Sequence, residues 1–234
     1  DDWFGDELRL GLQGVFPTEA RFYSLRKFPH QPPKAVRQKD WKHTKKQCTT
    51  EGFSVCAAIS AKGKTKLMRF GKKINCDKYC HFIRTFLRPA MDVVDHANIP
   101  MVTRRRLPTK RKRNKYHHDR DSSRLPQKTD KALIDMEIDG QLLAPKMWLG
   151  NPIEKWWGLF VSRLYDNGFK TYKDAKSLWE AAEKVWEETW EEHHKKIPAM
   201  LLKVPFYLKK IRQVDGRHLT RKEERAVDKE VRKL

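Results

Sequence analysis

A β-hairpin in the first third of the chain places the strongest limit on the fold. Residues 52–60 read Gly-Phe-Ser-Val-Cys-Ala-Ala-Ile-Ser, which is typical of a strand. Turn residues follow at 61–64, and residues 65–70 predict a second strand that returns along the first. A further strand and turn are indicated between residues 3 and 14. The predicted strands therefore come early in the chain.

The rest of the chain carries mainly helical patterns. We expect a helix capped by Asp77 and ended by Pro89, a second at about residues 127–136, a third that opens at Asn151, and a long helix over residues 172–194. The long helix has an apolar, tryptophan-containing face that predicts packing on the core, and an acidic face that predicts contact with solvent. Early strands followed by helices predict one layered α/β domain.

The balance of charge points to a polyanion as partner. The 234 residues include 51 Lys and Arg against 30 Asp and Glu, a formal net charge of +21, which favours nucleic acid. No apolar stretch approaches the roughly 20 residues that span a bilayer, so we expect no membrane-spanning segment. The basic residues are not gathered on one amphipathic helix, which argues against a membrane surface as partner. Aromatic residues make up 11% of the chain, too many for a disordered tail.

The positive charge is concentrated in two regions. Residues 34–73 hold 12 basic and two acidic residues, and residues 104–115, which we name the basic arm, hold eight basic residues and no acid. The arm predicts an exposed insertion at about residues 100–118, either a solvated loop or localisation signal, or a segment that contacts phosphates. The candidate nucleic-acid-binding residues are Arg104, Arg105, Arg106, Lys110, Arg111, Lys112, Arg113 and Lys115 in the arm, and Lys42, Lys45, Lys46, Lys62 and Lys64 in the earlier region.

Four cysteines, Cys48, Cys56, Cys76 and Cys80, are too few for the disulfide framework of a small secreted scaffold. Cys76 and Cys80 stand four residues apart with His81 adjacent, but structural zinc usually uses Cys-x2-Cys pairs. We therefore favour reduced, partly buried thiols over a zinc site. The chain begins at Asp1 rather than Met, and we expect it to be a processed or partial form.

Three carboxylates stand at places that suit metal chemistry. Asp6 ends the first predicted strand, Asp119 follows the basic arm, and Glu154 opens a helix, with 34 residues between the last two. Carboxylates brought together from distant segments suit a two-metal site, in which divalent ions activate an attacking oxygen and stabilise the leaving one. Glu154 also has a structural explanation, because an acid at the start of a helix stabilises the helix dipole.

Short motifs in five places resemble the mariner-type DNA transposases, in the order found in that family. They are Phe4-Gly5-Asp6-Glu7, the hairpin segment 53–63, the segment from Ile74 to Pro89, Asn151-Pro152-Ile153-Glu154 with Trp157-Gly158, and the segment from Lys203 to Gly216. The resemblance implies an RNase H-like core, a mixed sheet with flanking helices, over residues 1–216, with a C-terminal helical extension. It also implies that Asp6, Asp119 and Glu154 form a catalytic triad that binds Mg²⁺ or Mn²⁺. Residues 217–234 form a charged tail that we expect to be helical.

Two departures from the family pattern fall at the predicted catalytic centre. The family has an apolar strand directly before the second Asp, whereas residues 114–118 read Asn-Lys-Tyr-His-His, a poor composition for a central strand. Residues 92–95 have the better composition for a strand end, but Asp95 lies too far from Glu154 for the family spacing. Residues 147–150 replace the turn motif that precedes the third carboxylate.

Two functional hypotheses follow. In the first, the chain is a transposase-derived, nucleic-acid-binding component of a ribonucleoprotein such as an organellar ribosome, with RNA favoured over DNA, other proteins of the assembly as partners, and no cofactor. A mitochondrial location is then favoured, with the nucleus as the alternative. In the second, the chain is an active, metal-dependent DNA transposase core that cleaves and transfers strands. We favour the first, because the sequence changes lie where the chemistry would be.

Overall fold

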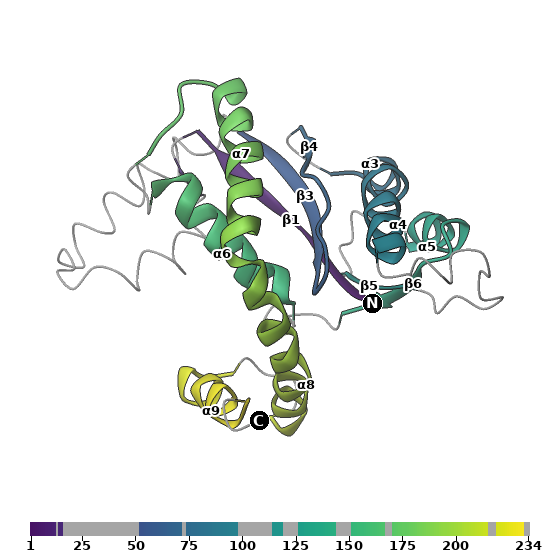
Figure 1. The fold of residues 1–234 in the computed structure, drawn as a ribbon, viewed down its shortest axis with the longest axis vertical. Coiled ribbons are helices and arrows are strands. Elements are labelled where there is room, and N and C mark those ends of the chain that lie inside the picture. The colour runs from purple at the N-terminus through teal and green to yellow at the C-terminus, as the bar shows by residue number, and fades with distance from the viewer. Residues whose placement is uncertain are drawn as a thin grey trace.

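The computed structural model describes residues 1–12, 14–15, 52–71, 74–97, 114–118, 126–143, 151–166, 170–214 and 219–231. Its strands are β1 (Asp2–Gly11), β2 (Gly14–Val15), β3 (Gly52–Ser60), β4 (Met68–Phe70), β5 (Lys115–His118) and β6 (Asp139–Leu142). Its α-helices are α3 (Cys76–Phe82), α4 (Arg88–Ala97), α5 (Pro126–Asp135), α6 (Pro152–Leu164), α7 (Ala175–His193), α8 (Ile197–Gln213) and α9 (Arg221–Val231) (Figure 1).

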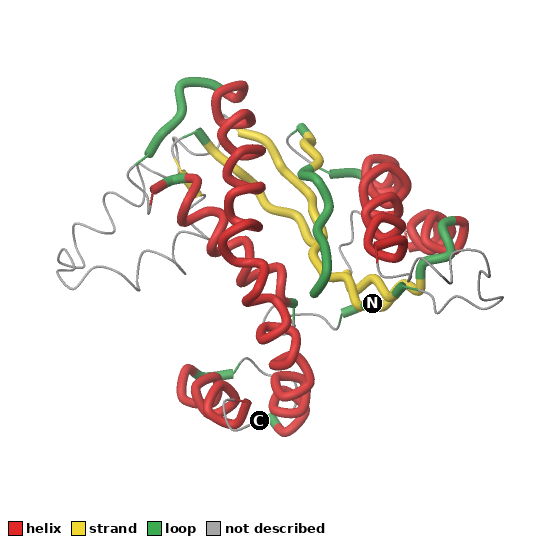
Figure 2. The backbone as a smooth tube through the Cα atoms, viewed as in Figure 1, coloured by secondary structure: helices red, strands yellow, loops and turns green. Residues whose placement is uncertain are grey.

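The strands form one mixed sheet with the order β4-β3-β1-β5-β6, and β2 pairs separately with β1. β4, β3 and β1 are antiparallel neighbours. β3 and β4 form the predicted hairpin, and β3 pairs with β1 over its full length. β5 and β6 run parallel to β1. The mixed sheet with flanking helices confirms the predicted fold class (Figure 2).

Helices cover both faces of the sheet. On one face, α6 and α7 bury an aromatic cluster against alternate residues of β1 and β3, among them Leu8, Leu10 and Val55. On the other face, α3, α4 and α5 pack against the intervening residues, among them Trp3 and Cys56. This division follows from the two-residue repeat of strands, in which neighbouring side chains point to opposite faces.

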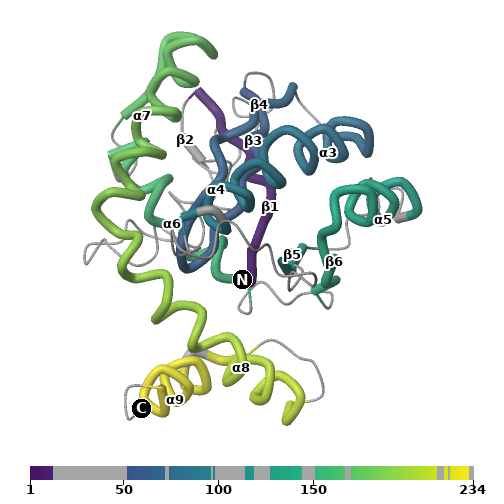
Figure 3. Tube along the Cα trace, turned by 45° about the vertical axis from the view of Figure 1, so that its right-hand side comes forward, coloured from purple at the N-terminus to yellow at the C-terminus, as the bar shows by residue number. Residues whose placement is uncertain are grey.

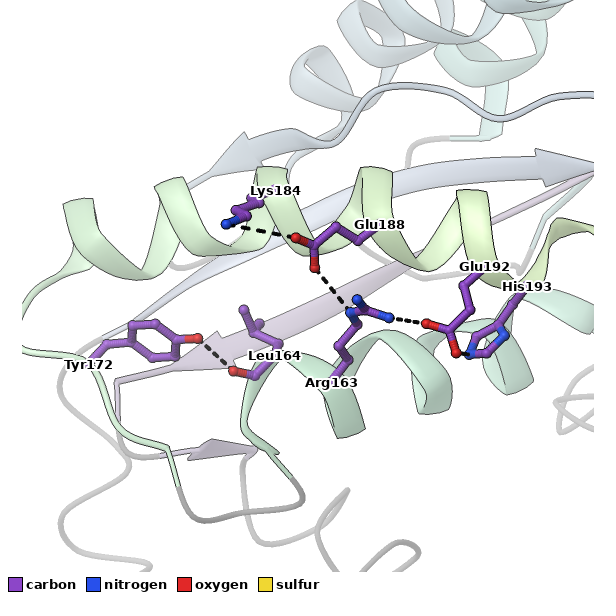
Figure 4. Close-up of polar contacts among 7 residues, drawn as sticks. All are labelled: Arg163, Leu164, Tyr172, Lys184, Glu188, Glu192 and His193. Carbon is purple, nitrogen blue, oxygen red and sulfur yellow. Dashed lines mark hydrogen bonds and ion pairs between the residues drawn. The ribbon is translucent and has the colours of Figure 1, made fainter.

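Ion pairs at the surface add to the apolar packing between α6 and α7. Arg163 of α6 reaches between Glu188 and Glu192 of α7, and Glu188 also pairs with Lys184 one turn away (Figure 4). Hydrogen bonds to both carboxylates raise the pKa of Arg163, so it stays charged. Part of the acidic face of α7 is therefore engaged with α6.

Helices α8 and α9 lie away from the sheet, at the end of α7 (Figure 3). The 3₁₀ turn His194–Lys196 joins α7 to α8, and α9 packs against α8 through the buried residues Tyr207, Leu219 and Val227. Within the described residues, no helix is both long enough and apolar enough to cross a membrane.

The helix that we expected to end at Pro89 continues to Ala97. A π-helical segment, Ile83–Leu87, joins α3 to α4, and the Arg88 N–H bonds to the carbonyl of Ile83. Pro89 then stands in the first turn of α4, where the missing N–H costs least. The N-cap is Asn75, whose side chain accepts from the Lys78 N–H at 3.0 Å, and not Asp77. Residues 92–95, considered above as a strand end, are part of α4.

Residues 115–118 form a strand, although their composition argued against one. Tyr116 and His118 are buried on the α3–α5 face and stack on each other with 5.4 Å between ring centroids. The Tyr116 hydroxyl shares a 2.9 Å hydrogen bond with that of Tyr79 on α3. His117, on the opposite face, stacks on Phe4 at 4.5 Å. Aromatic and imidazole rings thus take the places that apolar residues fill in an ordinary central strand.

Candidate functional site

Asp6 lies in the middle of β1 and faces α6. It shares this face with Leu8 and Leu10, which belong to the core cluster under α6 and α7, because all three occupy even positions along the strand. It pairs across the sheet with Ala57 of β3, which belongs to the same cluster. Asp6 is half-buried, so its carboxylate sits at the border between the apolar core and solvent.

Glu154 lies in the first turn of α6, three residues after the N-cap Asn151 and two after Pro152 at the first helical position. The helix packs against β1, and the Tyr165 hydroxyl at its other end donates to the carbonyl of Gly11 at 2.8 Å. Because of this contact, the C-terminal ends of α6 and β1 lie together, and the two elements run alongside each other (Figure 1).

The positions of Glu154 and Asp6 can be compared by the length of helix or strand that separates each from the Tyr165–Gly11 contact. Glu154 precedes Tyr165 by 11 residues of helix, about 17 Å at the helical rise. Asp6 precedes Gly11 by five residues of strand, also about 17 Å. The two carboxylates are therefore at about equal distances along their elements from the Tyr165–Gly11 contact, Asp6 on the sheet and Glu154 on the helix that covers it.

Asp119, the second predicted carboxylate, lies outside the described residues and follows directly after β5. β5 runs parallel to β1, with Phe4 paired to His117. Among the described residues, no group of three His, Cys, Asp or Glu side chains could hold a metal ion. Asp6 and Glu154 supply two half-buried carboxylates, the ligand type that Mg²⁺ and Mn²⁺ prefer, and these two residues fit such an ion as part of a ligand set.

Most of the predicted nucleic-acid-binding residues, Lys42, Lys45, Lys46 and positions 104–113 of the basic arm, lie outside the described residues. Lys115 is exposed on β5. Lys62 is about half exposed and pairs with Asp1 at 3.1 Å.

Lys64 has a different environment, because its ammonium group turns inward. It pairs with Glu187 of α7 and lies 5.7 Å from the ring centre of Trp186 and 6.0 Å from that of Trp190. Burial lowers the pKa of Lys64, and the Glu187 and Glu191 carboxylates partly offset this effect. These contacts fasten the hairpin to α7, and a role of Lys64 in binding nucleic acid stays a prediction.

The described cysteines are free and buried. The sulfur atoms of Cys76 and Cys80 are 3.9 Å apart, and burial together with the neighbouring Cys76 raises the pKa of Cys80 to about 11. His81 is engaged with Thr85 at 3.3 Å. The Cys80 thiol is therefore protonated at neutral pH, and both sulfur atoms lie inside the α3–α5 layer.

A polar network next to Glu154 was missed from the sequence. Lys155 of α6 donates to the Tyr207 hydroxyl of α8 at 3.2 Å, and Asp228 of α9 accepts from Lys203 and Tyr207. Its members come from three helices far apart in the chain, and no short motif signals that they meet.

The mixed sheet with helices on both faces defines an RNase H-like α/β domain. No protein-family model matches the chain, and no curated protein matches it. Solved structures do: the Mos1 transposase catalytic domain with raltegravir and Mg has a TM-score of 0.57 at 13% identity over 94% of this chain and 85% of that one. A pre-cleavage Mos1 transpososome gives 0.59 at 13% identity, over 94% of this chain and 57% of the other. The catalytic domain of Mos1 mariner transposase gives 0.53 at 12% identity, over 82% and 100%.

The chain therefore has the fold of a mariner transposase catalytic domain, and the resemblance predicted from its motifs is confirmed at the level of the fold. It spans little more than half of the chain in the transpososome.

Proposed function

We propose that this chain is a nucleic-acid-binding protein built on a transposase-type core, with RNA in a ribonucleoprotein such as a mitochondrial ribosome as its partner. The observation that carries the proposal is the formal net charge of +21 on this fold. A surplus of this size binds phosphates with little dependence on sequence.

The preference for RNA rests on the basic arm and on the sequence departures. Arginine-rich segments commonly order on RNA. Residues 114–118, before Asp119, and residues 147–150 differ from the transposase pattern, as expected for a chain released from a catalytic role. The solved neighbour that forms a transpososome supports nucleic acid in general and is neutral on RNA.

Binding of labelled single-stranded RNA and of duplex DNA of equal length, measured by fluorescence anisotropy from 50 to 200 mM KCl, tests the proposal. We expect tighter binding to RNA and a steep loss of affinity with salt. Replacing Lys110, Arg111, Lys112 and Arg113 by glutamine should weaken binding about tenfold or more. The matched control replaces the exposed Lys173, Lys176, Lys184 and Lys195, and should change it much less. Failure of the endogenous protein to co-sediment with ribosomal particles at low salt would contradict the ribosomal setting.

A second function, metal-dependent cleavage and transfer of DNA strands, is favoured by the geometry around β1. Asp6 and Glu154 lie on β1 and α6, which pack against each other, at about equal distances along the chain from the Tyr165–Gly11 contact. Asp6 lies two residues after Phe4, and Asp119 lies two residues after His117, so a continuation of the β1–β5 register would pair them. The three carboxylates would then hold divalent ions, and such ions supply activation of the attacking oxygen and stabilisation of the leaving one.

The catalytic alternative predicts nicking of supercoiled DNA that requires Mg²⁺ or Mn²⁺ and is lost in Asp6→Asn. It also predicts that Asp6→Asn weakens Mn²⁺ binding in calorimetry, whereas Asp92→Asn, which alters an ion pair on α4, leaves it unchanged. If wild-type protein neither nicks DNA nor binds Mn²⁺ while it still binds RNA, the catalytic alternative fails and the binding function stands.

A further inference from the structure

Polar groups from three helices meet around the carboxylate of Asp228. Its Oδ1 accepts hydrogen bonds from Lys203 Nζ at 2.7 Å and from the Tyr207 hydroxyl at 3.3 Å, both on α8. Lys155 Nζ of α6 donates to the same hydroxyl at 3.2 Å and lies 4.5 Å from the centre of the Tyr207 ring. Two ammonium groups and a phenol hydroxyl are therefore arranged around one anion.

The Asp228 carboxylate is partly exposed to solvent, whereas the Tyr207 side chain that contacts it is buried. The side chains of Lys203 and Asp228 are 26% and 35% exposed, but Tyr207 is buried. Burial acts to raise the pKa of Asp228, but Lys203, Lys155 and Tyr207 outweigh it and lower that pKa. Asp228 is therefore ionised at neutral pH, and its carboxylate marks a position that accepts negative charge.

Helix α9, which carries Asp228, is the more weakly attached partner in this arrangement. In the described part of the chain, its buried apolar contact with α8 is a small cluster of Tyr207, Leu219 and Val227. The aromatic cluster that holds α6 and α7 to the sheet is several times larger. An element with little buried apolar surface separates from the body at low free-energy cost.

We propose that Lys155, Lys203 and Tyr207 form a binding site for a backbone phosphate of nucleic acid, and that Asp228 occupies this site in the free protein. Lysine ammonium groups and a hydroxyl are common donors to phosphate oxygens. Lys155 directly follows Glu154, so a phosphate held there lies at the N-terminal end of α6, which carries one of the two candidate carboxylates. Binding of the phosphate displaces Asp228 and releases α9. The inference rests on the proposed binding of nucleic acid and adds a location and an internal competitor to it.

Anisotropy titrations with single-stranded RNA and duplex DNA test the site through three variants of the full chain. Asp228→Asn removes the competing charge and should tighten binding about threefold to tenfold. Asp92→Asn removes the same charge from the ion pair with Arg88 on α4 and should change affinity by less than about twofold. Adding Lys155→Gln to Asp228→Asn should cancel the gain, because it removes a donor from the phosphate.

Hydrogen exchange on the wild-type chain gives a test that needs no variant. Saturation with RNA should speed the exchange of the amides of residues 221–231, because α9 is displaced. Equal affinity gains in Asp228→Asn and Asp92→Asn, or slower exchange of α9 in the complex, would overturn the phosphate site while leaving the proposed function intact. Failure of the wild-type chain to bind either nucleic acid would overturn the proposed function, and this site with it.

Discussion

The two faces of the sheet are packed in different ways. On the α6–α7 face, the rings of Trp156, Trp157, Phe160 and Trp186 meet at centroid distances of 5.3 to 6.4 Å. On the α3–α5 face, the core includes aromatic rings, free thiols and the hydrogen-bonded hydroxyls of Tyr79 and Tyr116. The first face also carries the half-buried Asp6 and Glu154.

The two faces of the sheet therefore have different structural roles. Tight aromatic packing fixes α6, which carries Glu154, against the strand that carries Asp6. The α3–α5 face secures β5, which has few apolar residues of its own, through Tyr116 and His118. One face therefore positions the candidate site, and the other maintains the strand that leads to Asp119.

Trp186→Ala should produce the largest effect and tests whether the aromatic cluster is the main support of the site. Trp186 is 1% exposed, and its indole N–H donates to the Thr65 carbonyl at 2.8 Å, which ties α7 to the hairpin. We expect a loss of about 3–5 kcal/mol in the free energy of unfolding, measured by urea denaturation with circular dichroism. Trp186→Phe, which keeps a ring but not the donor, should lose less. A loss below about 2 kcal/mol for Trp186→Ala would show that the cluster does not dominate.

Gly5→Ala probes the other face and should cost about 1–3 kcal/mol. A Cβ at Gly5 would overlap the hydroxyl and ring of Tyr116, so the β5 ring packs where β1 has no side chain. Gly71→Ala is the matched control, because nothing lies within 4 Å of its Cβ position and the change should stay within about 0.5 kcal/mol. Equal effects at the two glycines in urea denaturation would mean that β1 and β5 do not pack this closely.

The sequence predicted correctly those elements whose own residues have a clear helical or strand pattern. The hairpin, the helix that opens at Asn151 and the long helix with Trp186 have strong local patterns, and the structure contains each of them. β5 could not be found in this way, because its stability comes from Tyr79 and Phe4, which are distant in sequence. Pro89 was misleading as a helix end, because a π-helical segment before it leads directly into α4, where Pro89 occupies the first turn.

The candidate site, too, could be predicted from the sequence only in part. The motifs named Asp6 and Glu154, but the placement of α6 along β1 depends on the tertiary contact of Tyr165 with Gly11. The network around Asp228 joins residues 52 and 21 positions apart in the chain, and single charged residues on amphipathic helices predict only solvated surface. Sites of this kind become visible only when the helices are in place.

Tyr79→Phe should have a smaller effect than either substitution above, and it isolates the polar part of the α3–α5 face. Loss of the 2.9 Å hydrogen bond leaves the Tyr116 hydroxyl without this partner, at a cost of about 1 kcal/mol. A double-mutant cycle with Tyr116→Phe should give a coupling of about 0.5–1.5 kcal/mol. Additive losses, with no coupling, would show that apolar packing alone holds β5 to α3.

The smallest expected effect is a pH dependence on the α6–α7 face, because it involves one group on which burial and ion pairing act in opposite directions. Burial lowers the pKa of Lys64 below its ordinary 10.5, while Glu187 and Glu191 oppose the shift. Between the lowered pKa and 10.5 the unfolded chain binds more protons at Lys64 than the folded chain, so the contribution of this residue to stability rises with pH. The stability of wild type relative to Lys64→Met should therefore increase from about pH 8 toward 10.5 in urea denaturation. Lys62→Met, which removes the exposed ion pair with Asp1, is the control for the loss of a lysine from the same hairpin. A relative stability that falls over the same range would mean that the Glu187 and Glu191 carboxylates outweigh burial, and that Lys64 is bound as a stabilised cation.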